Sequence, residues 1–308
     1  MWKYVLNRMV RLIPTFIAVS FLVFSLMSLT GDPARTMLGE TATEQELEML
    51  REELGLNEPL PVRYAEYMWN LLHGDLGETL FGRSVWNEFA ARFPNSVKLA
   101  IAGMLVTVLT AIPLGIISAV KQNTLVDTSL SALAMAGISM PSFWLGLLLV
   151  SLFAVTLEWL PATGAEGWKS IIMPAICAGV NNASLVARMT RSSMVDVIRA
   201  DYLRTARAKG VGEREVVLKH ALKNALIPII TIVGSQFSIL IGGTVVIESV
   251  FAWPGIGQYI VTSIRGNDFN AVTGCIIILT VFVALVLLCV DILYAFADPR
   301  IKARYTRK

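Results

Sequence analysis

Apolar residues fill six long runs of the sequence, and these runs predict transmembrane helices. They lie at about 9–30, 97–120, 129–157, 171–190, 226–247 and 271–296. A bilayer core about 30 Å thick needs roughly 20 apolar residues per helix, so each run is a candidate span. The third run is over-long and has Pro141 near its middle, which predicts a kink or a tilt. No alternating strand pattern and no internal repeat interrupts this order, so the predicted fold is all-α.

The composition agrees with a membrane protein and offers little catalytic chemistry. Hydrophobic residues make up 55% of the 308 residues and charged residues only 16%, whereas soluble domains carry about 25% charged residues. Cys177, Cys275 and Cys289 lie in apolar runs without CxxC spacing, which is typical of small buried side chains. The sequence has no phosphate-binding GxxxxGK[ST] loop and no paired carboxylates or Ser–His–Asp arrangement. We therefore expect no catalytic residue, no metal site and no enzyme activity in this chain.

The distribution of Lys and Arg predicts which ends of the spans face the cytoplasm. Residues 188–223 carry nine Lys or Arg against four acids, and basic residues also mark the two terminal tails. The opposing segments 158–170 and 249–270 carry one basic residue each. The first run is too long for a signal peptide, and no A-x-A site follows it, so we interpret it as a retained span. Both termini and the segment 188–223 are thus expected on the cytoplasmic side.

The segment between the first and second runs, about 31–96, is predicted to be a folded extracytoplasmic insertion. Thr43 and Glu46 form a capping-box pattern, and Gly55 marks the end of the helix that they begin. A second helix is predicted across "PVRYAEYMWNLLHG", with Pro61 near its start and Gly74 after it. Its apolar and aromatic face either packs on the neighbouring spans or docks an external partner; that face comprises Tyr64, Tyr67, Met68, Leu71 and Leu72.

The stretch Arg199–Pro228 is polar and helix-prone although it lies between two apolar runs. Asp201 to Lys209 can form a short helix that Gly210 and Gly212 end. A second helix begins at Glu213, with acids at its start and bases toward its end, as the helix dipole favours. Anionic lipid would attract the basic residues but would not require the small residues or the two glycines. Docking of a short helix into a partner accounts for both.

Polar residues inside spans are costly and are candidates for function. Amides and hydroxyls there also serve as contacts between helices, and the sequence leaves both roles open. The residues that we select as candidates for the translocation path are Asn181, Asn182, Ser235 and Gln236.

The stretch "DYLRTARAKGVGEREVVLKHALKNALIPIIT" strongly resembles the cytoplasmic signature loop of ABC-importer permeases of the dipeptide, oligopeptide and nickel group. The resemblance extends along the chain through "GDPAR", "ELGLNEPL", "HGDLG", "ARMTRSSMVDV", "VFAWPGIGQ" and "VDILYAFADPRI". It is closest to the first of the two paired permeases, among them dipeptide and glutathione types. Arg204, Thr205, Ala206 and Gly210 stand at the E-A-A…G positions of other importers, so arginine replaces the glutamate.

The resemblance implies a type I importer permease fold with six transmembrane helices in a bacterial or archaeal cytoplasmic membrane. Residues 1–30 would form the N-terminal tail and first span, 31–96 the insertion, and 97–308 a five-helix core with its coupling loop at about 191–225. The implied partners are a second homologous permease, two ABC ATPases that bind ATP and Mg²⁺, a peptide-binding protein and the bilayer, without nucleic acid. The coupling residues would be Tyr202, Leu203, Arg204, Thr205, Ala206, Arg207, Ala208, Lys209, Gly210 and Gly212.

Two alternatives to peptide import remain. One keeps the class of importer and changes the cargo to nickel or a metal chelate. The other is a secondary carrier or channel, which the lack of charged groups at the middle of the spans disfavours.

Overall fold

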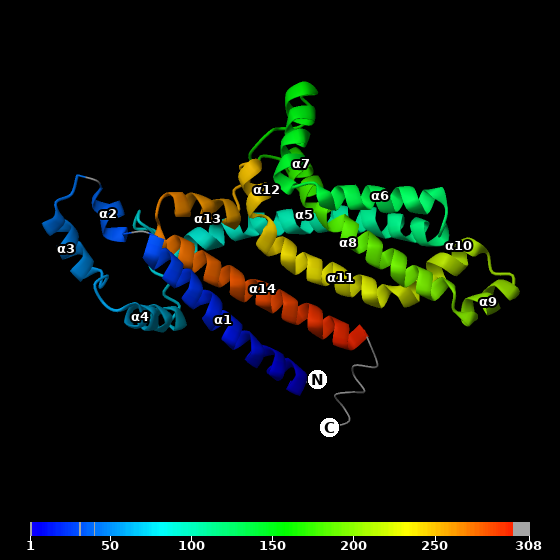
Figure 1. The fold of residues 1–308 in the computed structure, drawn as a ribbon, viewed down its shortest axis with the longest axis horizontal. Helices are drawn as coiled ribbons and strands as arrows, with labels where there is room; N and C mark the ends of the chain where they lie inside the picture. Colours follow the sequence, from blue (N-terminus) through cyan, green and yellow to red (C-terminus); the bar gives the residue numbers. More distant parts are fainter. Residues whose placement is uncertain (1, 31, 40, 298–308) are drawn as a thin grey trace.

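The computed structural model describes residues 2–30, 32–39 and 41–297, and this part of the chain is helical apart from loops and an isolated β-bridge between Glu78 and Ser84. Figure 1 shows the insertion helices α2–α4 at one end of the long axis and α9 and α10 at the other. The longer elements are α1 (Trp2–Thr30), α5 (Val85–Val120), α8 (Ile172–Ile198), α11 (Leu222–Gly243) and α14 (Phe269–Ala297). The shorter ones are α2 (Pro33–Leu38), α3 (Glu44–Glu53), α4 (Leu60–Leu72), α6 (Leu125–Ser139), α7 (Ser142–Leu149), η1 (Val150–Thr156), η2 (Trp168–Ile171), α9 (Asp201–Ala208), α10 (Glu213–Glu215), η3 (Val216–Ala221), α12 (Val245–Val250) and α13 (Ile256–Arg265).

Five helical segments of the described chain are long and apolar enough to cross a membrane. They are Met9–Leu29, Val85–Val120, Trp168–Ile198, Glu213–Gly243 and Phe269–Ile292. Five of the six predicted spans thus correspond to helices. The second begins at Val85, well before the expected start at 97. The basic C-terminal tail, 298–308, lies outside the described residues.

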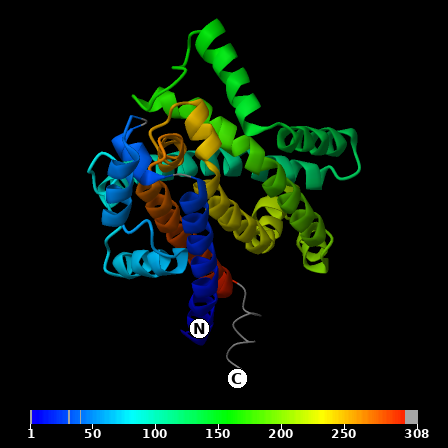
Figure 2. The same cartoon turned by 60° about the vertical axis from the view of Figure 1, so that its left-hand side comes forward.

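The third predicted span is not a single kinked helix. It consists of α6 and the pair α7–η1, which meet at 98° and count as a sixth span only if taken together. Met140 has extended backbone angles (φ −85°, ψ 123°), and Pro141 then caps α7. The ring of a proline disfavours the helical conformation in the preceding residue, so the helix ends there instead of bending through it. Figure 2 shows α7 projecting away from the body of the molecule.

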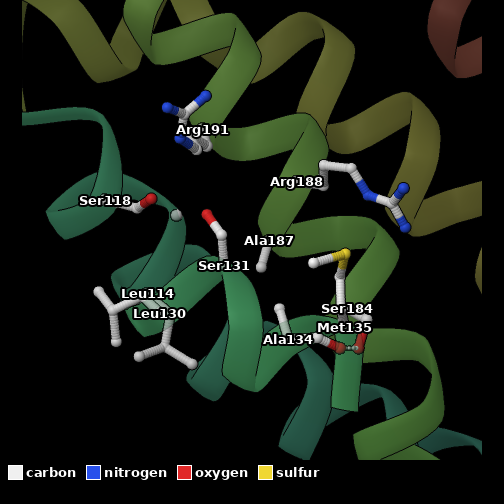
Figure 3. A pocket seen from close by; sticks show the side chains of 11 residues that line it. Leu114, Ser118, Leu130, Ser131, Ala134, Met135, Ser184, Ala187, Arg188 and Arg191 are labelled. Carbon is white, nitrogen blue, oxygen red and sulfur yellow. Dashed lines mark hydrogen bonds between the residues drawn. The ribbon is translucent and has the colours of Figure 1, made fainter. Parts of the chain in front are cut away.

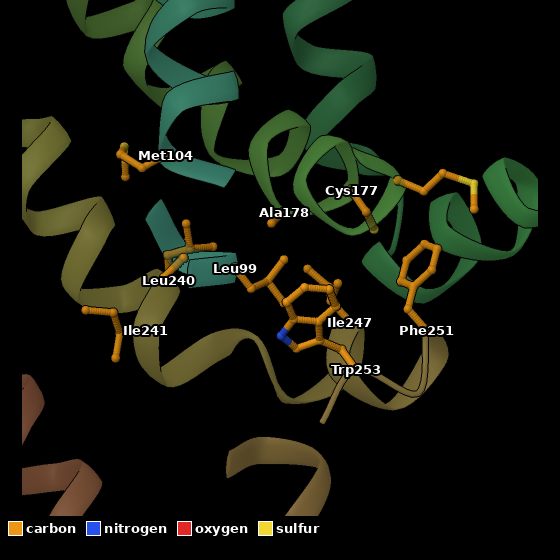
Figure 4. Close-up of a cluster of buried hydrophobic side chains, with 11 residues drawn as sticks. Leu99, Met104, Cys177, Ala178, Leu240, Ile241, Ile247, Phe251 and Trp253 are labelled. Carbon is orange, nitrogen blue, oxygen red and sulfur yellow. The ribbon is translucent and has the colours of Figure 1, made fainter. Parts of the chain in front are cut away.

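Small residues bring α5 and α8 into close contact at the centre of the fold. A Cβ on Gly103 would lie 2.7 Å from Ala178 Cβ, and one on Gly179 would lie 2.6 Å from a methyl carbon of Val106. Glycine is therefore required at both positions for the two backbones to approach so closely. Next to this contact, α11 and α12 complete a buried apolar cluster that includes Leu99, Cys177, Leu240 and Trp253 (Figure 4).

Both helices that the sequence predicts in the insertion are present, as α3 and α4, whereas α2 was not predicted, and α4 packs against α1. Thr43 and Glu46 form both hydrogen bonds of the capping box at the start of α3. On α4, the Tyr64 hydroxyl is 2.7 Å from Ser20 Oγ of α1, and its ring packs edge-on against Phe21 and Phe24. Part of the predicted apolar face of α4 is therefore a contact with a span, while Leu72 is 76% exposed.

An ion pair joins the start of the insertion to α3. Asp32 caps α2 through its contact with the Ala34 backbone N–H, and it also accepts two hydrogen bonds from Arg51, at 2.6 and 3.2 Å. These hydrogen bonds, led by that of Arg51, hold the pKa of Asp32 below its usual value.

This lowered pKa predicts that the insertion weakens in acid. A carboxylate with a depressed native pKa stabilises the fold above its unfolded value of about 3.9, and the contribution is lost as the pH falls through the native pKa. In wild type, we expect the backbone amides of the α2–α3 region to lose protection against hydrogen exchange below about pH 4. D32N should exchange faster at pH 7 and change less on acidification. An equal acid response in D32N would contradict the assignment.

Candidate coupling surface and translocation path

The short helix α9 is held on the membrane core by one side chain. Leu203 is completely buried among Met194 of α8 and Val216, Val217 and Ala221 of η3. Ala206, one turn later, is half-buried against the same cluster. Asn224 Nδ2 donates to the Tyr202 hydroxyl at 2.7 Å. Leu203 and Ala206 thus lie on the side of α9 that faces the protein, whereas Tyr202 is 45% exposed.

The turn after α9 has a fixed shape. Gly210 has φ +81°, a conformation that favours glycine, and its N–H donates to Arg207 O at 2.9 Å. Arg207 also forms two hydrogen bonds with the Glu213 carboxylate, at 2.8 and 2.9 Å. Arg207 is one of the predicted coupling residues. In the structure Arg207 pairs with Glu213 of the same chain, and this ion pair stabilises the turn between α9 and α10.

The remaining predicted coupling residues form an exposed surface. Arg204 has only a 3.7 Å contact with Asp201, and the side chains of this pair are 79% and 96% exposed. The other exposed members of the predicted set are Thr205, Ala208, Lys209, Gly210 and Gly212. A short helix that is fixed on one side and presents small and basic residues on the other is suited to contact a groove with acidic walls.

Two of the four predicted path residues meet. Gln236 Nε2 of α11 donates to Asn182 Oδ1 of α8 at 2.7 Å, and Asn182 also donates to Ala178 O. Ser235 donates to Thr231 O within α11. The Asn181 Nδ2 atom is buried and has no hydrogen-bond partner in the described chain. The amides therefore join α8 to α11, and the assignment of the four residues to the path stays a prediction.

An ion pair that the sequence analysis did not identify joins α6 to α8. Both oxygens of Asp127 accept from Arg191, at 2.6 and 2.7 Å, and the carboxylate also accepts from the Ser118 hydroxyl of α5. The Asp127 side chain is 6% exposed and the Arg191 side chain 31%. A cavity of about 150 Å³ lies beside this pair between the three helices (Figure 3). The sequence signal was an isolated acid at the start of an apolar run.

A second missed residue, Glu248 of α12, is fully buried. Its Oε1 accepts from Ser96 Oγ at 2.7 Å and from Thr244 Oγ1 at 2.9 Å, while Oε2 accepts from the Gln258 N–H at 3.0 Å. Neutral donors thus satisfy a buried carboxylate and join α5, α12 and α13. The signal in the sequence was a single acid within the apolar run before Phe251.

The close fit around Glu248 predicts a sharp effect of G255A. A Cβ at Gly255 would lie 2.4 Å from the Glu248 carboxyl group. Such overpacking costs about 1–3 kcal/mol, so the purified protein should unfold at a lower temperature than wild type. G243A is the matched control because a Cβ there meets no atom within 4 Å. Equal unfolding temperatures for G255A and G243A would refute the predicted clash.

The fold is that of the membrane subunits of ABC importers. A chain described as "Inward facing conformations of the MetNI methionine ABC transporter" is similar with a TM-score of 0.60 and 16% identity, covering 68% of this chain and 96% of that one. A chain from "Crystal structure of an amino acid ABC transporter with histidines" gives a TM-score of 0.51 and 13% identity, covering 70% and 94%. These likenesses concern the fold alone.

The sequence comparisons define the family. The model of the binding-protein-dependent transport system inner membrane component matches residues 111–303, and the model of its N-terminal part matches residues 1–100. The chain belongs to this family of permeases. It is 44% identical over 304 residues to the Glutathione transport system permease protein GsiC of Salmonella choleraesuis (strain SC-B67), covering 98% of this chain and 99% of that protein. GsiC of Escherichia coli (strain K12) is 43% identical over the same coverage.

The comparisons confirm the family and fold class that the sequence motifs indicated. The chain is a multi-pass membrane subunit of a binding-protein-dependent importer. Membership of this family implies ATPase and binding-protein partners.

Proposed function

We propose that this chain is one of two permease subunits of an ATP-driven importer for small peptides, glutathione-like peptides among them. The observation that carries the proposal is the 43–44% identity to glutathione permeases over 98% of the chain. Relatedness over the whole length includes α9, the spans and the insertion, and therefore every part of the permease subunit that the proposal uses. Cargo passes between this chain and a second, homologous permease.

The proposed arrangement places α9 in the cytoplasm and the insertion outside. The insertion and α9 lie at opposite ends of the long axis in Figure 1, and the basic residues gather near α9. Two ABC ATPases hold ATP and Mg²⁺ and supply the energy. This chain contributes no catalytic residue, nucleotide site or resident metal. The peptide-binding protein docks on the outer side, and both termini are cytoplasmic.

Coupling follows from how α9 is mounted. Closure of the ATPases pushes on the exposed residues Arg204, Thr205 and Lys209, and Leu203 transmits the displacement to α8 and η3 because it is buried between them. The amide pair Asn182–Gln236 lies between α8 and α11 and changes its environment when these helices separate. Asn181 and Ser235 complete the proposed path.

Transport by the reconstituted complex tests the proposal. Proteoliposomes that hold both permeases and both ATPases, supplied with the binding protein, should take up labelled glutathione and di- to oligopeptides only when ATP is present. Import of nickel or a nickel chelate without peptide uptake would instead support the metal importer. Uptake that survives ATP depletion and collapses with the proton gradient would support a secondary carrier.

A further inference from the structure

One face of α8 is left open by its neighbours. Around the helix, Gly179 and Thr190 contact α5, Ser184 donates to Ala134 O of α6, and Asn182 accepts from Gln236 of α11. The remaining face contains Asn181, Leu185, Arg188 and Ser192, which recur at intervals of three or four residues and therefore share one side of the helix. Arg188 and Ser192 are exposed.

Arg188 differs from Arg191, three residues later on the same helix. Arg191 has its carboxylate in this chain, Asp127. Arg188 has no ion-pair or hydrogen-bond partner among the described residues. In Figure 3 its side chain extends away from Ser118 and Arg191. Arg188 lies about 24 Å along α8 from the start of the helix, still inside a segment long enough to span the bilayer. This position is near the cytoplasmic end of the span, in agreement with the distribution of Lys and Arg, and the exposed guanidinium there is available to an anion.

The polarity of this face argues against contact with lipid tails. Contact with lipid tails requires an apolar surface. The surface of α7 is apolar, since its exposed side chains include Phe143, Trp144, Leu147 and Leu148. The open face of α8 instead exposes the guanidinium of Arg188 and the hydroxyl of Ser192, and on the same side lies the buried Asn181 Nδ2, which has no hydrogen-bond partner in the described chain. These donors are those that bind carboxylates, and arginine does so with two parallel hydrogen bonds.

We propose that Arg188 binds the carboxylate of the cargo as it passes along α8, and that the importer therefore selects peptides with a free carboxyl group. The inference rests on the proposed peptide import and narrows its substrate class. Peptides with a free C-terminus carry the required anion, and a bare metal cation does not. Arg188 attracts the carboxylate of the cargo, whereas Arg191 maintains the packing of α6 on α8.

The test compares R188Q with R188K in the reconstituted complex, using one peptide as its free acid and as its C-terminal amide. R188Q should lower uptake of the free acid per ATP hydrolysed at least about tenfold, because a hydrogen-bonded charge is lost. ATPase stimulation by the loaded binding protein should stay near the wild-type rate. R188K should retain most uptake, and the wild-type preference for the free acid over the amide should disappear in R188Q.

Several outcomes would overturn the inference. Unchanged uptake and preference in R188Q would show that Arg188 does not contact the cargo. Failure of R188Q to assemble with the second permease would assign Arg188 to a subunit ion pair. If the effect of R188Q on uptake depends on the fraction of anionic lipid and not on the cargo, Arg188 binds a lipid headgroup instead. If wild type itself imports no peptide, the proposed function fails. If wild type imports peptide and R188Q imports it equally well, only the proposed role of Arg188 fails.

Discussion

Gly210→Pro is expected to reduce ATP-driven uptake at least about tenfold while leaving membrane insertion intact. Proline fixes φ near −65°, whereas Gly210 has φ +81°, and proline also removes the N–H that donates to Arg207 O. The turn between α9 and α10 must then change shape, and α9 can no longer transmit movement through Leu203. Uptake and binding-protein-stimulated ATPase activity of the reconstituted complex measure the effect.

Gly212→Ala provides the matched control in the same turn. Gly212 has φ −60°, and a Cβ at this position would meet no atom within 4 Å, so alanine fits without strain. A206E tests the neighbouring contact, because a carboxylate would enter the apolar cluster around Leu203. G210P with wild-type uptake and ATPase stimulation would exclude this turn from coupling.

Removing Asp127 is expected to produce the largest loss of stability from a single side chain. D127A leaves Arg191 without its carboxylate in a partly buried site between three helices. Breaking a buried ion pair in this way costs about 3 kcal/mol or more. Chemical unfolding of the purified protein in detergent should show the loss.

The exposed pair Asp201–Arg204 is the control for this experiment, since D201A removes a carboxylate that is 96% exposed and should leave unfolding unchanged. The double variant D127A/R191L should recover much of the stability, because it removes both charges. A D127A protein as stable as wild type would show that the pair does not hold α6 on α8.

The helices of the insertion and α9 could be predicted because their signals are local. Thr43 and Glu46 lie three residues apart and set the start of α3 by themselves. The helix of Asp201–Ala208 ends close to the glycine that the sequence identified as its stop. Such signals depend on neighbouring residues and do not require knowledge of the packing.

The break at Pro141 could be predicted only in part. Proline indicated a change of direction in the third run, but a kink and a 98° turn share the same local sequence. The difference depends on what α7 packs against, and η1 continues it into a projecting segment. Hydropathy measures how apolar a segment is and contains no information about its direction.

The polar contacts between distant elements could not be read from the sequence. Asp127 and Arg191 are 64 residues apart, and Ser96 and Glu248 are 152 apart. Each pair forms only in the folded chain, where α6 meets α8 and α5 meets α12. By contrast, the amides Asn182 and Gln236 were selected for their cost inside a span, and that reasoning does not require knowledge of their partners.

The segment that follows Gly212 is one continuous helical rod that includes the π-helical stretch η3 and Pro228. It runs through α10, η3 and α11 from Glu213 to Gly243, 31 residues, and at 1.5 Å per residue it is about 46 Å long. A tilt of roughly 5° about its first turn would displace its far end by about 4 Å. That far end joins α12, where Glu248 ties the chain to α5 and α13. The rod therefore has the geometry of a lever, because a small rotation beside α9 becomes a side-chain-sized movement at the other end of this helical segment.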